Sequence, residues 1–183
     1  MAKPTTIKDA LQMWEKKTGQ VSTNAKDIGL LFQKPPIEKM DSALGTLTKC
    51  LKLSLAGNMI VNISGIGSLK NLRILSLACN NIKRLNGIEA LGETLEELWI
   101  SSNQIKGLKP IESMKALKVL HVANNRIKAW TEFDRLNIPP KLEEITFAGN
   151  PLCEKMDEST FRSEAIRRLQ SLKTLDSVVI RGD

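Results

Sequence analysis

Aromatic side chains are scarce in this sequence. It contains no tyrosine, and three tryptophans and four phenylalanines make up only 4% of its 183 residues, although hydrophobic residues as a whole reach 42%. Leucine and isoleucine must therefore fill the interior, as expected of a fold that repeats one aliphatic pattern. The length fits one domain, which can bury a sufficient core without a disulfide or a metal.

Cysteine is also sparse. Cys50, Cys79 and Cys153 are an odd number, and no Cys-x-x-Cys pair occurs. We therefore expect neither a disulfide framework nor a zinc site, and we expect a reducing compartment. No apolar run approaches the roughly 18–20 residues that a membrane helix needs, and the first residues lack the apolar core of a secretory signal. These absences predict a cytoplasmic chain with no membrane, metal or cofactor.

Groups that could carry catalysis are few as well. His121 is the one histidine, so any Ser–His or Cys–His mechanism must pass through it, and no carboxylate is placed to orient it. Glycine-rich phosphate loops and His-Glu-x-x-His elements are absent. The pairs Glu96-Glu97 and Glu143-Glu144 fall in expected strands, where adjacent side chains point to opposite faces. The sequence predicts that the protein is not an enzyme.

Charge is in excess but not concentrated. The formal net charge is +7, from 27 Lys and Arg against 20 Asp and Glu, and no run of five or six basic residues occurs. A solvated surface of mixed charge is the favoured interpretation, and an acidic partner is the alternative.

One repeat organises the chain. Apolar residues stand eight, five and three positions before, and two positions after, each of five asparagines, and Cys50 is the one exception to aliphatic or aromatic occupancy. In the first four units, apolar residues recur five, eight and eleven positions after the asparagine. This is the leucine-rich repeat, L-x-x-L-x-L-x-x-N-x-I. The asparagines are Asn58, Asn80, Asn103, Asn125 and Asn150.

The repeat predicts an α/β solenoid. Its alternating apolar residues form a short strand on the concave side, and those spaced by three suit a helical or 3-10 return on the convex side. Stacked repeats pair their strands in parallel and bury both apolar sets. Each asparagine amide can satisfy buried backbone groups where the chain leaves the strand, so we expect the five to form a ladder.

Both ends of the stack require caps. Thr6–Lys17 is predicted to be a helix, because Thr6 and Asp9 have capping-box spacing, and an irregular strand is expected around Leu30–Phe32. At the other end, Phe161, Ala165, Ile166 and Leu169 form one helical stripe that closes the core. The predicted single domain, 1–183, divides into 1–49 (helix and irregular first repeat), 50–152 (five repeats), 153–176 (helical cap) and 177–183 (loose tail).

The same periodicity identifies the free strand surface. Residues six, four and two positions before each asparagine point away from the core, and adjacent strands lie about 4.8 Å apart. Four of them, on three adjacent strands, form a contiguous, largely apolar patch edged by Glu97 and Glu144, and tryptophan is typical of interface anchors. The four are Ile74, Trp99, Val119 and His121. The alternative is that a terminal segment of the chain covers Trp99. The candidate partner-binding residues of this concave patch are Ile74, Ser76, Glu97, Trp99, Val119, His121, Glu144 and Thr146.

Several segments carry a more specific resemblance. The chain resembles the leucine-rich-repeat light chain 1 family of axonemal outer-arm dynein over nearly its whole length. The matching segments are Ala2–Ala10, Pro35–Asp41, Asn71–Leu77, Thr94–Ser101, Gly149–Leu152 and Leu172–Asp176. The first two are specific to the family, because they do not belong to the repeat consensus.

The resemblance implies a non-catalytic subunit of a ciliary or flagellar motor, located in the cytoskeleton of the axoneme. In that family the light chain binds a dynein heavy chain at the microtubule-binding domain of its stalk and modulates motor–microtubule engagement, with tubulin as a further candidate partner. The strand face and the last helix are the family's contact surfaces, which adds Arg162, Arg167 and Arg168 here. Family members often carry tyrosine at the positions of Ser102 and His121, and this chain has none.

A generic repeat scaffold, of the phosphatase-regulatory or spliceosomal kind, remains the alternative. Such proteins share the repeats and the Asn150-Pro151-Leu152 cap but not the opening helix or Pro35–Asp41. Nucleic acid is not an expected partner, because the strand face offers only Lys52 as a basic residue.

Overall fold

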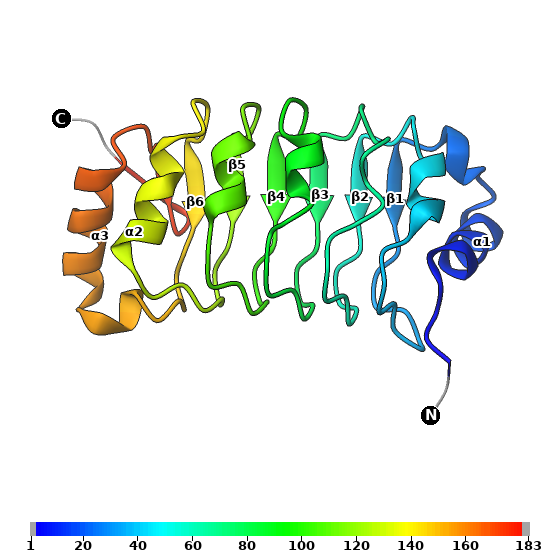
Figure 1. Cartoon of the computed structure of the whole chain (residues 1–183), viewed down its shortest axis with the longest axis horizontal. Coiled ribbons are helices and arrows are strands. Elements are labelled where there is room, and N and C mark those ends of the chain that lie inside the picture. The colour runs from blue at the N-terminus through cyan, green and yellow to red at the C-terminus, as the bar shows by residue number, and fades with distance from the viewer. Residues whose placement is uncertain (1–2, 181–183) are drawn as a thin grey trace.

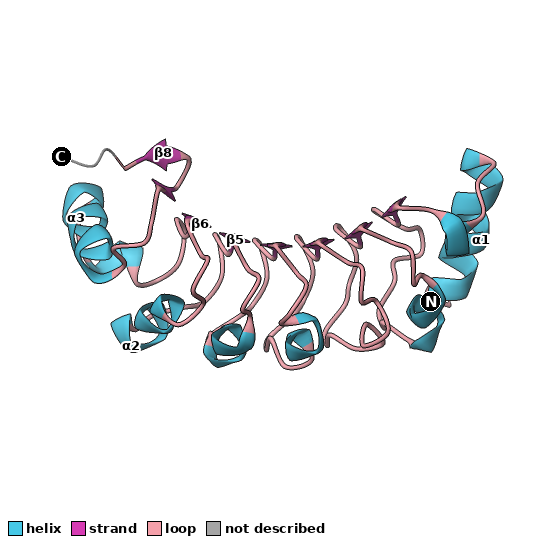
Figure 2. Cartoon of the chain, turned by 90° about the horizontal axis from the view of Figure 1, so that it is seen from above, coloured by secondary structure: helices cyan, strands magenta, loops and turns pink. Residues whose placement is uncertain are grey.

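The repeats stack into a curved solenoid. The computed structural model describes residues 3–180 and shows an arc with strands along its inner side and short helices along its outer side (Figures 1 and 2). The sheet has eight strands in sequence order, of which β1 to β7 pair in parallel and β8 pairs antiparallel with β7. The strands are β1 Asp27–Gly29, β2 Lys52–Ser54, β3 Ile74–Ser76, β4 Glu97–Trp99, β5 Val119–His121, β6 Glu144–Thr146, β7 Thr174–Leu175 and β8 Val178–Val179.

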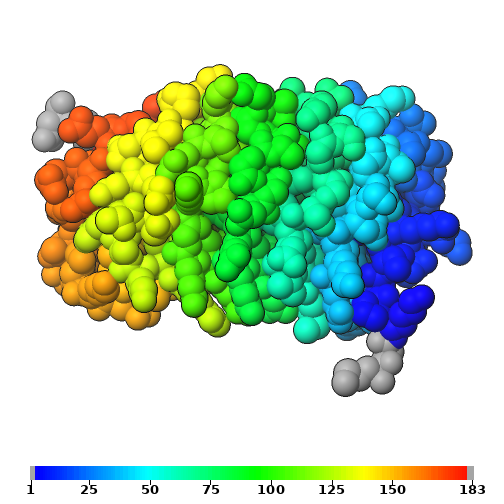
Figure 3. Space-filling model, in the orientation of Figure 1, coloured from blue at the N-terminus to red at the C-terminus, as the bar shows by residue number. Residues whose placement is uncertain are grey.

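Short helices form most of the convex returns. The space-filling view shows each repeat packed directly against the next along the whole arc (Figure 3). The core lies between the two layers, where Leu53, Leu75, Leu98, Leu120 and Ile145 from successive strands are fully buried. The predicted leucine-rich-repeat solenoid is therefore confirmed. The short helices are η1 Ser22–Asn24, η2 Ser42–Thr46, η3 Ile88–Leu91, η4 Lys109–Ser113, α2 Trp130–Phe133, η5 Asp134–Asn137 and η6 Cys153–Lys155.

The five asparagines form the predicted ladder. In the central unit, Asn103 Oδ1 accepts the N–H of Ile82 at 2.9 Å, and its Nδ2 donates to the carbonyls of Leu77 and Ile100 at 2.9 and 3.2 Å. Asn58, Asn80, Asn125 and Asn150 repeat this arrangement. Each amide thus joins its own strand to the preceding repeat and satisfies backbone groups that would otherwise be buried and unpaired.

The residue before each asparagine adopts the left-handed conformation. Glycine supplies it at Gly57 and Gly149, but Cys79, Ser102 and Asn124 also have φ between 53° and 58°. The turn from strand to return requires this conformation in every repeat, and a side chain there carries a steric cost.

The N-terminal cap follows its sequence signals. Helix α1 spans Ile7–Thr18, one residue beyond the predicted end, and Thr6 Oγ1 both accepts the N–H of Asp9 and donates to its carboxylate. The predicted first strand is wrong by three residues, since β1 is Asp27–Gly29 and not Leu30–Phe32. Phe32 has φ +46°, so it occupies the left-handed turn position of its repeat, where a strand residue cannot lie.

The C-terminal cap differs from prediction in two ways. Helix α3, Glu158–Arg168, buries Phe161 and Ala165 with Leu169 beyond its end, but Ile166 is only half-buried, because it is turned about 100° from Ala165. The predicted loose tail is wrong for 178–179, which form β8. Residues 181–183 of that tail lie outside the described residues.

Two contacts hold the final hairpin. The carboxylate of Asp176 accepts the N–H groups of Phe147 and Ala148 at 2.6 and 2.9 Å, beyond the end of β6. From α3, the Arg162 guanidinium donates to the carbonyls of Leu175 and Val178 at 3.1 and 3.2 Å.

Within residues 3–180, no helix has the length and apolar character needed to cross a membrane.

Candidate functional site

The sheet places the predicted concave patch on adjacent strands. Its register aligns Lys52, Ile74, Glu97, Val119 and Glu144 in one row across β2 to β6. A second row aligns the middle outward residues. Both rows are the ones that the repeat predicts, because outward strand positions are fixed once the leucines point inward. The second row is Ser54, Ser76, Trp99, His121 and Thr146.

Trp99 is held in one orientation by three neighbours. Its indole N–H donates to the Glu97 carboxylate at 3.1 Å, and its ring meets His121 edge to face at a centroid distance of 5.8 Å. The ammonium of Lys52 lies 5.8 Å from the ring centroid. These contacts fix a large, partly exposed aromatic side chain before any partner arrives, which lowers the entropy cost of binding.

Ser76 lies beneath this arrangement. Lys52 comes from β2 and Trp99 from β4, so their side chains meet above β3, where Ser76 is only 5% exposed. A direct partner contact through the Ser76 side chain, expected from the sequence, is therefore not supported. Its small size instead leaves space for the Lys52–Trp99 contact.

The patch is less apolar than the sequence suggests. His121 Nδ1 lies 3.1 Å from the Thr146 hydroxyl, and the Glu97 carboxylate accepts the hydrogen bond of the Trp99 indole N–H. Along the first outward row, including Asp27 of β1, three carboxylates oppose the single ammonium of Lys52, which lies 3.8 Å from Asp27. The result is an aromatic centre with an acidic border.

No terminal segment covers Trp99 among the residues that the structure describes. Its side-chain neighbours come from the sheet itself, and the helices α1 and α3 lie at opposite ends of the arc (Figure 2). The alternative, in which a terminal segment covers Trp99, is therefore not observed, and the concave patch is open to solvent.

The three predicted arginines lie on α3, at the C-terminal end of the arc and away from Trp99 (Figure 1). Arg168 donates to both carboxylate oxygens of Asp134 and stacks over Trp130 at 4.6 Å, and it shares Glu164 with Arg167. Arg162 holds the final hairpin. Their side chains therefore stabilise the cap, and only Arg167, 69% exposed, projects largely into solvent.

Two of the three cysteines are poorly suited to act as nucleophiles. Burial raises the pKa of the Cys50 and Cys153 thiols to about 11, which disfavours the thiolate that a nucleophile requires. The hydrogen-bond partner of the His121 ring is a threonine and not an orienting carboxylate. Over residues 3–180, no group of three His, Cys, Asp or Glu side chains is arranged to hold a metal ion.

Sequence reasoning missed Lys52 as a member of the site. Its position in the first outward row was visible, but its reach across β3 to Trp99 depends on side-chain direction, which periodicity does not give. The signal in the sequence was that Lys52 is the lone lysine among the outward strand positions and lies two strands away from Trp99, the tryptophan of that face.

Comparison with known proteins identifies close relatives. The family model "Leucine Rich repeats (2 copies)" matches residues 48–90 and 93–135. The chain is 56% identical over 185 aligned residues to "Dynein axonemal light chain 1" of Mus musculus, covering 100% of this chain and 97% of the relative. It is 48% identical to the protein of the same name from Chlamydomonas reinhardtii, covering 100% and 94%.

Solved structures show the same fold at lower identity. An internalin C2 from Listeria monocytogenes matches with a TM-score of 0.60 and 24% identity, over 76% of this chain and 58% of that one. A chain of the Drosophila melanogaster SNF/U2A′ complex matches with a TM-score of 0.61 and 24% identity, over 71% and 74%. These likenesses concern the solenoid fold alone.

Proposed function

The chain belongs to the dynein axonemal light chain 1 family of leucine-rich-repeat proteins, and on that basis we propose that it binds a dynein heavy chain at the microtubule-binding domain of the stalk. Its role is that of a non-catalytic light chain of an axonemal dynein in the ciliary or flagellar cytoskeleton. Through this contact it modulates how the motor engages the microtubule. The generic-scaffold alternative loses its basis, because the full-length relatives carry the light-chain name.

One observation supports the concave patch as the contact surface. Trp99 is partly exposed at the centre of the sheet and is already oriented by Glu97, His121 and Lys52. Interface anchors are enriched in tryptophan and bind best when their orientation needs no reorganisation.

The rest of the strand face suits a close approach. The outward row nearest the asparagines consists of small residues, which leave room for a helix or a backbone of the partner. Because Glu97 and Glu144 border the patch, the partner should offer an apolar side chain flanked by basic residues. The small row is Ala56, Ala78, Ser101, Ala123 and Ala148.

Trp99→Ala tests the proposal. We expect about 30- to 1,000-fold weaker binding to a recombinant heavy-chain microtubule-binding domain, because truncating an anchor typically costs about 2–4 kcal/mol. Titration calorimetry measures the affinity, and circular dichroism measures folding. Adding His121→Ala should weaken binding further, because it removes a second large side chain of the concave patch.

Met59→Ala is the matched control. Met59 is 47% exposed and apolar but lies off the strand face, so its truncation should leave affinity unchanged. A folded Trp99→Ala protein with wild-type affinity would exclude the concave patch as the interface. Equal losses in both variants would point to a diffuse hydrophobic contact instead.

Motor engagement is the second part of the proposal. Microtubule co-sedimentation measures the affinity of the heavy-chain domain for microtubules. Adding wild-type light chain should shift this affinity from its value for the domain alone, and adding the Trp99→Ala variant should not. If the curves with and without wild-type light chain were identical, the light chain would have no influence on the microtubule contact, against the proposal.

A further inference from the structure

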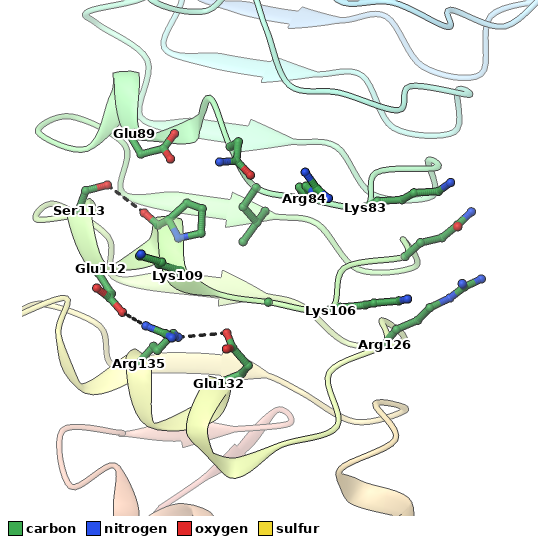
Figure 4. Close-up of a pocket in the computed structure, with 15 residues that line it drawn as sticks. Lys83, Arg84, Glu89, Lys106, Lys109, Glu112, Ser113, Arg126, Glu132 and Arg135 are labelled. Atoms are coloured by element: carbon green, nitrogen blue, oxygen red, sulfur yellow. Dashed lines mark hydrogen bonds and ion pairs between the residues drawn. The ribbon is translucent and has the colours of Figure 1, made fainter.

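A second hollow lies on the convex side of the stack. It is a groove of about 880 Å³ bounded by η3, by η4 and by the helices α2 and η5 (Figure 4). Its basic lining residues are Lys83, Arg84, Lys106, Lys109, Arg126 and Arg135. We refer to this hollow as the convex groove.

The carboxylates of the convex groove are already occupied. Glu112 and Glu132 both pair with Arg135, and Glu89 accepts the backbone N–H of Gly87 at 2.6 Å. Within residues 3–180, the other five basic side chains of the groove form no salt bridge. The groove therefore carries an excess of positive charge, six cations against three carboxylates, in contrast to the acidic border of the concave patch.

Three of these cations come from successive repeats. Lys83 and Lys106 both stand three positions after their asparagines, and Arg126 follows Asn125 directly. Figure 4 shows all three side chains extending toward the same end of the groove, one from each successive repeat. All three residues are exposed, so an incoming anion meets them without rearrangement.

The remaining lining suits a polypeptide. Asn86 and Gln104 offer amide donors and acceptors that can pair with a peptide backbone. No aromatic residue lines the groove, so it lacks the stacking platforms on which single-stranded nucleic acids are usually held.

We propose that the convex groove binds an acidic, extended polypeptide segment that crosses the repeats from Lys83 to Arg126. Acidic side chains of that segment pair with Lys83, Lys106 and Arg126 in turn, and its backbone contacts Asn86 and Gln104. This surface is separate from the concave patch, so the protein can hold two partners at once.

The test uses the full chain and a labelled, glutamate-rich peptide, with binding followed by fluorescence anisotropy at several salt concentrations. The double variant Lys83→Glu with Lys106→Glu should bind at least about tenfold more weakly at low salt and show a flatter salt dependence. Lys83→Ala with Lys106→Ala should give a smaller loss in the same direction. Because both lysines are exposed, circular dichroism should be unchanged.

Lys34→Glu with Lys39→Glu is the matched control. It changes net charge equally at two exposed lysines in the first repeat, away from the groove. An equal loss in this control would show general charge attraction and overturn the proposal, as would no binding of the peptide at low salt.

Two further measurements separate the alternatives. A single-stranded oligonucleotide of equal charge should bind more weakly than the peptide; tighter binding, lost in the Lys83/Lys106 variant, would assign the groove to nucleic acid instead. Trp99→Ala should leave peptide binding unchanged, and a loss in that variant would place the peptide on the strand face and overturn the proposal.

Discussion

The concave patch and the convex groove are made by the same repeats, yet one carries an aromatic centre with carboxylates and the other carries lysines and arginines without an aromatic. Trp99 and Lys106 stand only seven positions apart in one repeat. Between them, Asn103 turns the chain from the strand to the return, so residues close in sequence come to lie on opposite sides of the stack. A repeat thus provides two independent surfaces on one shared interior.

This division has a physical basis. Positions that point inward accept only apolar residues or the ladder asparagine, because any other group would be buried without a partner. Outward strand positions and the first and third positions after the asparagine are free of that constraint. The two surfaces can therefore acquire opposite charge without a change in the core.

Both surfaces depend on the ladder as well as on the apolar core, and of the changes considered, removing a ladder asparagine should have the largest effect on stability. Asn103→Ala leaves the buried Ile82 N–H without its acceptor and removes one of the two amide donors to the Leu77 carbonyl, the other being Asn80. We expect a loss of about 2–3 kcal/mol in the free energy of unfolding, measured by urea denaturation. Asn71→Ala is the control, because its amide donates to Thr48 at the exposed surface, and its loss should stay within about 0.5 kcal/mol. Equal values for the two variants would contradict the role of the ladder.

Much of the concave patch could be predicted from the sequence. The asparagine spacing fixes which residues point inward, and the register of Ile74, Glu97 and Val119 follows from it. What spacing cannot give is side-chain reach, so the Lys52–Trp99 contact and the burial of Ser76 appear only in the structure.

The ends of the stack were harder to predict because they are not repetitive. The β7–β8 turn uses Asp176 and Ser177, both with positive φ, and contains no glycine to signal a hairpin. The pairing of Arg168 with Asp134 joins residues 34 positions apart, and local patterns carry no signal for it. The convex groove was missed for another reason: its six cations are spread over three repeats, two in each, so no long basic run exists in the sequence.

Acid should act on the convex side of the C-terminal cap more than on the strand side, where backbone hydrogen bonds dominate. Hydrogen bonds from Arg167, and then Arg168, lower the pKa of Glu164 to about 2, from an ordinary value near 4.5. A lowered folded-state pKa stabilises the fold above the unfolded value, and this contribution disappears as pH falls from about 4.5 to about 2. Glu164→Gln should therefore lower Tm at pH 6 and make little difference at pH 2.

The control for this pH effect is Glu93→Gln. Glu93 pairs with Lys115, but both side chains are about 70% exposed, so the pair should contribute little at any pH. Thermal unfolding followed by circular dichroism provides the comparison. A Glu164→Gln deficit that persisted unchanged at pH 2 would show that packing, rather than charge, is lost.

The smallest expected effect concerns the turn that separates the two surfaces. Ser102 has φ +58°, is exposed, and keeps its backbone N–H bond to the Ala123 carbonyl at 2.9 Å. A left-handed conformation costs a residue with a Cβ about 1–2 kcal/mol, and the greater freedom of glycine in the unfolded chain returns about 0.4–1 kcal/mol of that. Ser102→Gly should therefore stabilise the protein by up to about 1.5 kcal/mol in urea denaturation. Gly149→Ala, at φ +74°, should destabilise it, because the added Cβ would collide with the Asn124 side chain.

Neither change should alter binding at Trp99 or at Lys106, since the turn lies between the two surfaces and belongs to neither. A stabilised Ser102→Gly protein that lost either partner would show that the turn orients that surface, and the two faces would then not be independent.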